Sequence, residues 1–323
     1  MAAEGLSARR RLRLRWLRHA LLWRARRAGR ALRVVANRTS LIRPGDALAV
    51  LVARDEVEAL PAWLDHLRAL GLRHVLAVDN GSLDGTREWL AAQPEVSLWE
   101  AAGSYREARF GMDWANALLG RFGPGRWCLT LDADERLLFP RPERGLQGLT
   151  QALEAGGREA LPCLMIDLYG DPKGGLWFDA EGFHARRQPR FGHVVVRGGP
   201  RGRLLFADAP HRAPVLSKLP LVRWRSGFAY VGSTHHALPS RLNRALDALD
   251  PLAGPEAGPR GALLHGKLLP GLGARARAER DRGEHGRPSA YHEGLMAEPD
   301  FRHEGSQPWT GWEGLASSGL LRE

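Results

Sequence analysis

The stretch Trp127-Cys128-Leu129-Thr130-Leu131-Asp132-Ala133-Asp134-Glu135 decides the fold of this chain. Its first five residues are mostly apolar and too few for a helix, so they predict a buried strand. Three carboxylates follow within four positions, and like charges at a strand end are costly to bury unless a cation neutralises them. In an open α/β sheet, ligands bind at the carboxyl ends of the strands. We therefore expect a cation-binding site here; the alternative is a plain acidic turn.

The two aspartates of this stretch indicate which cation to expect. Asp132 and Asp134 are two residues apart and can direct their oxygens toward one point. Hard oxygen ligands of this kind suit Mg2+ or Mn2+. Carboxylate-bearing turns follow two earlier apolar runs as well, at Arg54-Asp55-Glu56 and at Asp79-Asn80-Gly81-Ser82-Leu83-Asp84-Gly85-Thr86. The sequence therefore predicts three acidic strand ends in series.

Strand and helix patterns alternate around these turns. The predicted strands cover 47–53, 74–78, 96–99 and 127–131, and the predicted helices cover 57–70, 86–92 and 105–120. This order predicts an α/β fold with a mostly parallel central sheet flanked by helices. After residue 140 the pattern weakens: we expect short strands at 161–168, 221–224, 228–231 and 263–269, a helix at 241–250, and long loops over 170–203.

The positive charge of the chain is confined to its N-terminus. Of the net charge of +11, residues 1–43 carry +12, with thirteen Arg and the single acid Glu4, so the other 280 residues sum to −1. A nearly neutral body argues against nucleic-acid binding by the domain. We therefore divide the chain into a basic amphipathic arm (1–43), a central folded domain (44–273) and a polar C-terminal tail (274–323).

The basic arm has the pattern of an amphipathic helix. One narrow stripe carries its apolar residues, and most arginines, with Trp16 and Trp23, lie on the other faces; the stripe consists of Leu14, Leu17, Leu21, Ala25, Ala28 and Leu32. Such a helix fits an anionic membrane surface, and no run is long enough to span a bilayer. A solvated arm and a transit peptide are the alternatives. Cys128 and Cys163, far apart in apolar surroundings, predict buried thiols in a reducing compartment.

In their order and spacing, the three acidic strand ends resemble the GT-A catalytic domain of glycosyltransferase family 2. The closer resemblance is to bacterial family-2-like enzymes with a late Leu-His-x-Lys segment, here Leu264-His265-Gly266-Lys267. It covers roughly residues 47–270. The resemblance implies a GT-A-like fold and a transferase, inverting by analogy, that uses a nucleotide-sugar donor and Mn2+ or Mg2+.

The resemblance also implies roles for individual residues. Asp132 and Asp134 match the metal-binding D-x-D motif, and Asp132 also belongs to the donor site. Asp79 matches the acid that holds the base or ribose, although Asn80 stands where the family pattern has a second Asp. Arg54 and Glu56 lie in the turn that would wrap the nucleotide. His265 matches a late metal or diphosphate ligand, with His235 as its competitor, and Lys267 matches a diphosphate ligand.

Other candidates follow from their position in the chain. Arg109, with Arg106, precedes the D-x-D strand and is a candidate clamp for phosphate oxygens; Lys218 and Arg203 are weaker ones. Inversion requires a carboxylate that deprotonates the acceptor hydroxyl. Asp167, at the end of a predicted strand, is our first candidate for this base, and Asp171 and Asp179 are alternatives. His235 and His236 are expected to line the acceptor cleft.

The sequence thus predicts transfer of a sugar from a nucleotide donor to a glycan or lipid-linked acceptor. The expected place is cytoplasmic, peripheral at the inner face of the membrane, and the expected setting, by analogy, is surface polysaccharide assembly. One alternative is a nucleotidyltransferase, which should carry a Gly-rich basic loop after its first strand; Ala53-Arg54-Asp55-Glu56 contains no Gly. The other is a non-enzymatic adaptor that binds membrane or nucleic acid through residues 1–43.

Overall fold

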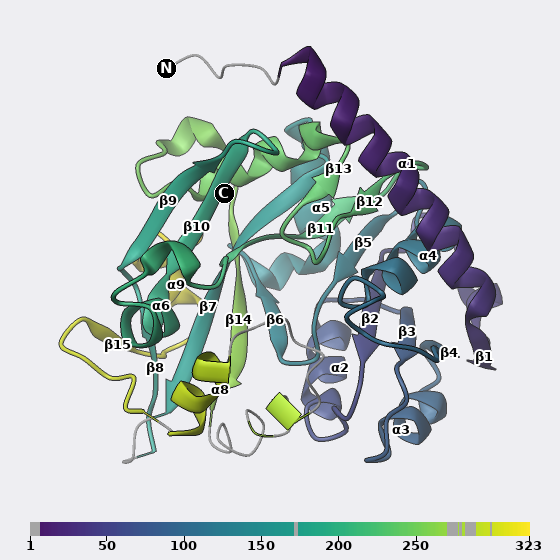
Figure 1. Ribbon diagram of the computed structural model, residues 1–323, viewed down its shortest axis with the longest axis horizontal. Helices are drawn as coiled ribbons and strands as arrows, with labels where there is room; N and C mark the ends of the chain where they lie inside the picture. The colour runs from purple at the N-terminus through teal and green to yellow at the C-terminus, as the bar shows by residue number, and fades with distance from the viewer. Residues whose placement is uncertain (1–6, 171–173, 270–276, 278–279, 282–288, 298) are drawn as a thin grey trace.

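The stretch that decides the fold forms β5 (Trp127–Thr130), inside a large mixed sheet (Figure 1). The computed structural model describes residues 7–323 except 171–173, 270–276, 278–279, 282–288 and 298. Four neighbouring strands, β4 (Val96–Glu100), β3 (Val75–Asp79), β2 (Leu48–Ala53) and β5, run parallel in that order. Because their side chains are buried almost throughout, these strands need the nearly continuous apolar runs seen in the sequence.

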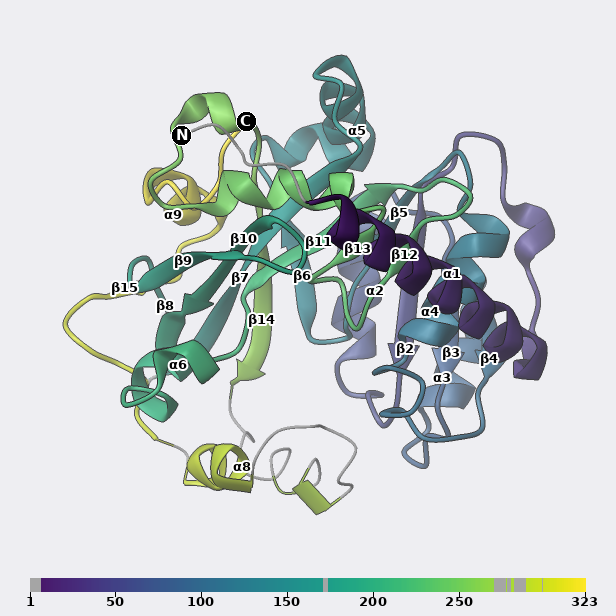
Figure 2. The same ribbon diagram turned by 45° about the horizontal axis from the view of Figure 1, so that its top comes forward.

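Beyond β5 the sheet continues with both strand directions. β11 (Ser217–Arg223) lies antiparallel between β5 and β7 (Ala160–Gly170), and β14 (Gly261–Leu268) lies parallel to β7 and antiparallel to β6 (Glu135–Leu138). Helices flank the sheet (Figure 2): α2 (Leu60–Ala69), α3 (Thr86–Ala92), α4 (Met112–Phe122) and α5 (Gly145–Ala155). The predicted α/β class is confirmed: four adjacent strands run parallel within the mixed sheet, and helices flank it.

The helix predicted over 105–120 begins only at Met112. Arg109, Phe110 and Gly111 have φ values of 58°, 57° and 76°, which a right-handed helix excludes. A side chain at Gly111 would also meet Val52 and Tyr105. The prediction was therefore wrong for residues 105–111, and this left-handed turn brings the start of α4 close to β2.

The loops predicted over 170–203 were also largely wrong. This segment contains β8 (Leu176–Asp179), β9 (Phe183–Gln188), β10 (His193–Gly198) and the start of α6 (Gly199–Leu205). β9 and β10 form a hairpin. Three of the six β9 residues are exposed and none is buried, so this strand lacks the apolar pattern of a buried strand. The helix predicted at 241–250 is a 3-10 helix, Ser240–Leu249, and the strand at 228–231 shortens to β12 (Ala229–Tyr230), paired with β13 (Ala237–Leu238).

Both ends of the chain fold onto the domain. α1 (Ala8–Ala31) packs on α4 and β12, and β1 (Arg33–Ala36) pairs with β4 at the sheet edge (Figure 1). Near the C-terminus, β15 (Ser306–Pro308) pairs with β8, and α8 (Ser289–Met296) and α9 (Trp312–Ser317) contribute Leu295 and Leu315 to the core. The division at residues 43 and 273 stays a prediction. No helix in the described ranges is long and apolar enough to cross a membrane.

Candidate functional site

A cleft of about 500 Å³ opens at the carboxyl ends of β2 and β5, where the sequence predicted the site. It is bounded on the other side by residues of β7, β11 and β14. Its lining contains three carboxylates, two tyrosines, four basic side chains and three histidines: Arg54, Glu56, Tyr105, Asp132, Asp134, Arg201, Lys218, His235, His265, Lys267, Tyr291 and His292. Of the side chains that the sequence analysis named, eight therefore share this cleft: Arg54, Glu56, Asp132, Asp134, Lys218, His235, His265 and Lys267.

A buried lysine neutralises the acidic stretch. Lys218 on β11 donates hydrogen bonds to Oδ2 of Asp132, at 3.1 Å, and to Oε1 of Glu135. Burial alone would lower the pKa of Lys218, but the charges of Asp132 and Glu135 raise it above its usual range. Burial raises the pKa of Glu135, and Lys218 opposes that change. The cation that the three carboxylates require is thus partly supplied by the chain itself.

A second network follows from strand register. His265 on β14 lies directly opposite Glu135 on β6 and Asp167 on β7, so the three side chains share one face of the sheet. The Nδ1 atom of His265 is 2.6 Å from Oδ1 of Asp167, and its Nε2 atom is 3.2 Å from Oδ2 of Asp134. Arg201 of α6 donates from Nε to Oδ2 of Asp167 at 2.8 Å. Asp134, His265, Asp167 and Arg201 thus alternate in charge.

These contacts fix the protonation of the second network. Burial would lower the pKa of His265, but the charge of Asp134 and the hydrogen bonds to both aspartates raise it to about 9. Burial would likewise raise the pKa of Asp134 and of Asp167, yet His265 holds the first, and Arg201 with His265 the second, below the usual range. His265 is therefore an imidazolium at neutral pH, held between two carboxylates.

Asp167 is the predicted base, but both of its oxygens are engaged and its side chain is 1% exposed. It does not line the cleft. A buried carboxylate with a lowered pKa and two cationic partners is a poor proton acceptor. Its geometry favours a positioning role for His265 and Arg201.

The other two acidic turns are tied to each other. The amides of Asp55 and Glu56 donate to the hydroxyls of Ser82 and Thr86, at 3.0 and 2.8 Å. Asp55 has a φ of 54°, which these contacts and the bond from the Leu83 amide to Oδ1 of Asp55 stabilise. The turn after β2 is thus rigidly placed, with Arg54 and Glu56 at the cleft.

Asp79 ends β3 below these turns and is fully buried. Its Oδ2 accepts from the amides of Gly81 and Ser82, while Oδ1 accepts no hydrogen bond from any described residue. Asn80 donates to the carbonyls of Ala101 and Gly103. Asp79 does not line the cleft. The remaining support for its predicted role is its buried Oδ1 atom, which has no hydrogen-bond donor among the described residues.

The structure does not bring Arg109 to the cleft. Its guanidinium donates to the carbonyl of Val231 and so ties the turn before α4 to the segment between β12 and β13. Arg203 likewise lies near Asp179, at 3.6 Å, and donates to the carbonyl of Phe301. Asp179 accepts from Tyr169 and His303, and Asp171 lies outside the described residues. Arg109, Arg203 and Asp179 thus hold segments of the fold together in this structure.

The two adjacent histidines have different surroundings. His235 lines the cleft, and its Nδ1 atom lies 2.8 Å from the carbonyl of Ser217. Because a carbonyl only accepts, Nδ1 carries the proton and Nε2 bears the lone pair of the neutral ring. His236 instead pairs with His193 at 2.9 Å and stacks on Phe191, so it does not line the cleft.

Arg201 and Tyr105 were missed by the sequence analysis. Arg201 lines the cleft with a 4% exposed side chain, and its Nη2 atom is buried without a partner among the described residues. Tyr105 faces the same cleft, and burial, followed by the charge of Asp132, raises its pKa. No spacing pattern could reveal Arg201, because its partner Asp167 is 34 residues away on another element.

The carboxylates fit a hard divalent ion only in part. The side chains of Asp132 and Asp134 are 56% and 35% exposed, and their contacts with Lys218 and His265 use Oδ2 of each. Two carboxylate oxygens with waters and phosphates would suit Mg2+ or Mn2+. Within the described residues, however, no three His, Cys, Asp or Glu side chains gather around one point. Waters and phosphate oxygens would therefore have to complete the coordination of a metal ion here. The role of His265 as a third metal ligand stays a prediction.

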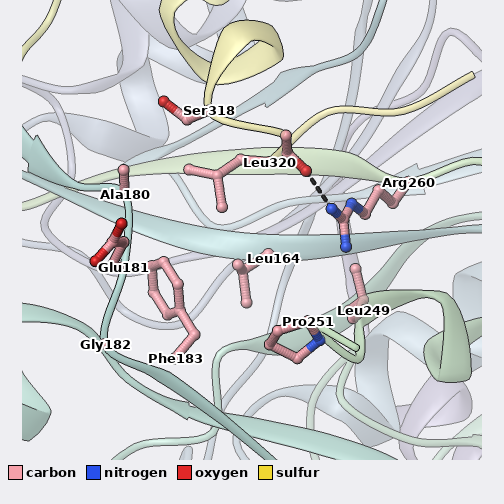
Figure 3. A pocket seen from close by; sticks show the side chains of 11 residues that line it. Leu164, Ala180, Glu181, Gly182, Phe183, Leu249, Pro251, Arg260, Ser318 and Leu320 are labelled. Atoms are coloured by element: carbon pink, nitrogen blue, oxygen red, sulfur yellow. Dashed lines mark hydrogen bonds between the residues drawn. The ribbon is translucent and has the colours of Figure 1, made fainter. Parts of the chain in front are cut away.

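A second pocket, of about 280 Å³, lies on the opposite face of β7 (Figure 3). Leu164 lines it, whereas Met165 lines the cleft, because successive side chains of a strand alternate. Phe183 and Leu320 give it apolar walls, and Arg260 donates to the carbonyl of Gly319. This pocket contains no paired carboxylates, so the chemistry belongs to the cleft.

Comparison with known proteins adds little to this geometry. No protein-family model matches the chain, and no curated protein matches it. Among solved structures, the mannosyltransferase PcManGT of Pyrobaculum calidifontis, solved with GDP-Man and Mn2+, is similar at 15% identity and a TM-score of 0.30, over 92% of this chain and 81% of that one.

Two nucleotidyltransferase-type structures are similar at the same level. A 4-diphosphocytidyl-2C-methyl-D-erythritol synthase has 16% identity and a TM-score of 0.29, over 70% of this chain and 90% of its own. A glucose-1-phosphate thymidylyltransferase of Bacillus anthracis, solved with sucrose, has 7% identity and a TM-score of 0.30, over 66% and 78%. Likenesses this weak carry no argument, so the proposal below depends on the cleft alone.

Proposed function

We propose that this protein is a glycosyltransferase of the family-2-like type that takes its sugar from a nucleotide-sugar donor. One observation supports this most directly: two carboxylates at the end of β5 share a single cleft with four cationic side chains, Arg54, Arg201, Lys218 and Lys267. Cations beside carboxylates suit a diphosphate that binds with a divalent ion, because each charge in such a site then has a partner.

In this proposal the two sides of the cleft have separate tasks. Asp132 and Asp134 would hold Mn2+ or Mg2+, which neutralises charge on the departing diphosphate when bound. Arg201, already oriented by Asp167, and Lys267 would bind the remaining phosphate oxygens. The turn at Arg54 and Glu56 would enclose the nucleotide, and Oδ1 of Asp79 would accept from its base or ribose.

Transfer also requires a group that takes the proton of the acceptor hydroxyl. We assign this task to His235, whose Nε2 atom bears the lone pair, in place of the sequence-based candidate Asp167. In-line attack on the anomeric carbon would invert its configuration. We propose a glycan or lipid-linked acceptor at the inner face of the cytoplasmic membrane; the two free, buried cysteines suit a reducing compartment.

Nucleotidyl transfer is the competing proposal for the same cleft. The turn after β2 lacks the Gly-rich basic loop expected for that chemistry, and its backbone amides at Asp55 and Glu56 are engaged by Ser82 and Thr86. These amides are therefore not open to cradle a triphosphate. This favours glycosyl transfer.

Calorimetric titration of UDP and of GDP, each with and without Mn2+, tests the proposal. We expect Mn2+-dependent binding of one nucleotide that Asp134→Ala abolishes, while Asp65→Ala, which removes an exposed carboxylate of α2, leaves it intact. The absence of binding under every metal condition, or equal binding by Asp134→Ala, would refute it. Release of UDP or GDP from a matching sugar donor, without formation of pyrophosphate, would then separate glycosyl from nucleotidyl transfer.

A further inference from the structure

The apolar stripe of α1 packs against the rest of the protein. Leu14, Leu21 and Ala25 are buried, and the two leucines pack with Phe191 and Val231. The stripe predicted to face a membrane therefore faces the protein, and any external partner must contact the opposite side of the helix.

Polar contacts fix which side of α1 faces outward. Arg24 donates to Oδ2 of Asp113 at 2.9 and 2.6 Å and to the carbonyl of Glu107 at 2.6 Å. Further along, a side chain at Gly29 would come within 3.0 Å of Ala117, so α1 and α4 approach closely there. The helix thus cannot turn its buried face outward without taking the half-exposed Arg24 away from the carboxylate of Asp113, whose side chain is only 5% exposed.

The outward face of α1 carries exposed apolar side chains in one line. Leu12, Trp16 and Trp23 are 54%, 70% and 60% exposed. At about 100° per residue they fall within roughly 40° of one another around the helix axis. Figure 1 shows α1 along the outer edge of the molecule, and in Figure 2 it lies in front of the other elements, so neither view shows an element over its far side. Large aromatic side chains are seldom left in water in a row without a partner.

Arginines flank this line on both sides. Six are exposed on the outward half of the helix: Arg9, Arg13, Arg15, Arg26, Arg27 and Arg30. The guanidinium of Arg27 lies 5.8 Å from the ring of Trp23, and α1 contains no acidic residue. A row of tryptophan and leucine between arginines matches the boundary between anionic headgroups and acyl chains.

We propose that the outward face of α1, defined by Leu12, Trp16, Trp23 and the six flanking arginines, lies flat on an anionic lipid surface. This goes beyond the proposed transfer reaction and does not require it. A nucleic acid would also attract the arginines, but phosphate binding alone does not call for an apolar row between them. The chemistry thus favours a lipid surface. Because α1 is packed firmly on the domain, its binding would hold the whole domain in one orientation on that surface.

Vesicle flotation with the full chain tests this proposal. The probes are vesicles of phosphatidylcholine alone and of phosphatidylcholine with phosphatidylglycerol. We expect binding only to the anionic vesicles and at least about a hundredfold weakening when Arg13, Arg15, Arg26 and Arg30 are changed to Gln, since each arginine near an anionic surface contributes about fivefold. The double variant Trp16→Ala/Trp23→Ala should weaken binding at least about tenfold.

Two matched controls separate the surface from general effects. Changing four exposed arginines elsewhere, Arg73, Arg144, Arg186 and Arg212, to Gln removes the same charge, and Leu252→Ala removes an apolar side chain that is 94% exposed. Both should bind vesicles as the parent chain does. Thermal unfolding and nucleotide titration of every variant should match the parent, so a failure here is distinct from a failure of the proposed function.

Three results would overturn the proposal. The first is equal loss of binding in the arginine control, which would mean that the net charge of the protein alone determines vesicle binding. The second is unchanged binding by the tryptophan double variant. The third is tighter, tryptophan-dependent binding of a single-stranded oligonucleotide than of anionic vesicles at the same salt concentration, which would make the face a nucleic-acid surface.

Discussion

The Nδ1 atom of His265 lies 2.6 Å from Oδ1 of Asp167, across the parallel pair β14 and β7. The contact joins the two residues for which the sequence predicted different tasks, metal binding and proton abstraction. Because His265 also meets Asp134, a change at the deeply buried Asp167 is transmitted to the D-x-D stretch.

Asp167→Asn should lower the free energy of unfolding by about 3 kcal/mol, because it leaves the buried cations His265 and Arg201 without their shared carboxylate. Urea unfolding measures that loss. We also expect weaker nucleotide binding, since Arg201 loses its orientation. If Asp167 were the base instead, kcat would fall while stability and nucleotide affinity stayed at parent values.

Lys218→Met should destabilise the protein in a pH-dependent way. At pH 8 the buried Glu135 loses its cation, and we expect a loss of about 3 kcal/mol. At pH 5 the loss should be smaller, because burial raises the pKa of Glu135 and the carboxyl can take up a proton. The double variant Lys218→Met/Glu135→Gln should recover most of the stability at pH 8. A double variant as unstable as the single one would show that the pair does not act as a unit.

The contrast between the acidic stretch and Lys218 shows how much the sequence could predict. Asp132 and Asp134 follow their own strand directly, so the apolar run and the turn locate them with local information. Lys218 is 83 residues from Glu135 and lies on β11, which β7 and β14 separate from β6 in the strand order. Side-chain partners that depend on register and on the order of strands leave no periodic signal in one sequence.

A similar limit applies to α1 and to residues 105–111. Helical periodicity identified which side of α1 is apolar, but could not show that the domain itself, through Phe191 and Val231, covers that side. Near Arg109 the composition suits a helix, whereas the structure has a left-handed turn in which Gly111 lies against Val52. In both places tertiary contacts decide the outcome.

The stability of the protein should decline at alkaline pH through His265. Its pKa is about 9 in the folded chain, above the ordinary value of about 6.5. The folded state therefore binds the extra proton between these values, so the stabilisation is fully present below about pH 6.5 and is lost as the pH rises through about 9. The slope due to this group cannot exceed about 1.4 kcal/mol per pH unit. Urea unfolding from pH 6 to 10 measures it.

His265→Gln provides the comparison for this pH series, because glutamine has no proton to lose in that range. We expect the variant to be less stable than the parent at pH 6.5 and the difference between them to shrink toward pH 10. Parallel stability curves for the two proteins would contradict the assignment of a charged His265 between Asp134 and Asp167.

His235→Gln should abolish most of the turnover and leave nucleotide binding intact. The ring is held by the Ser217 carbonyl, at 2.8 Å from Nδ1, so its Nε2 atom is the proton acceptor in the neutral form. General-base catalysis is worth about 10²- to 10⁴-fold in rate, and glutamine cannot supply it. Steady-state kinetics with a donor identified by the nucleotide titrations measures kcat, and His211→Gln, at an exposed histidine, is the control. If His235→Gln kept the parent kcat while Asp167→Asn lost it at unchanged affinity and stability, the base would be Asp167, as the sequence alone predicted.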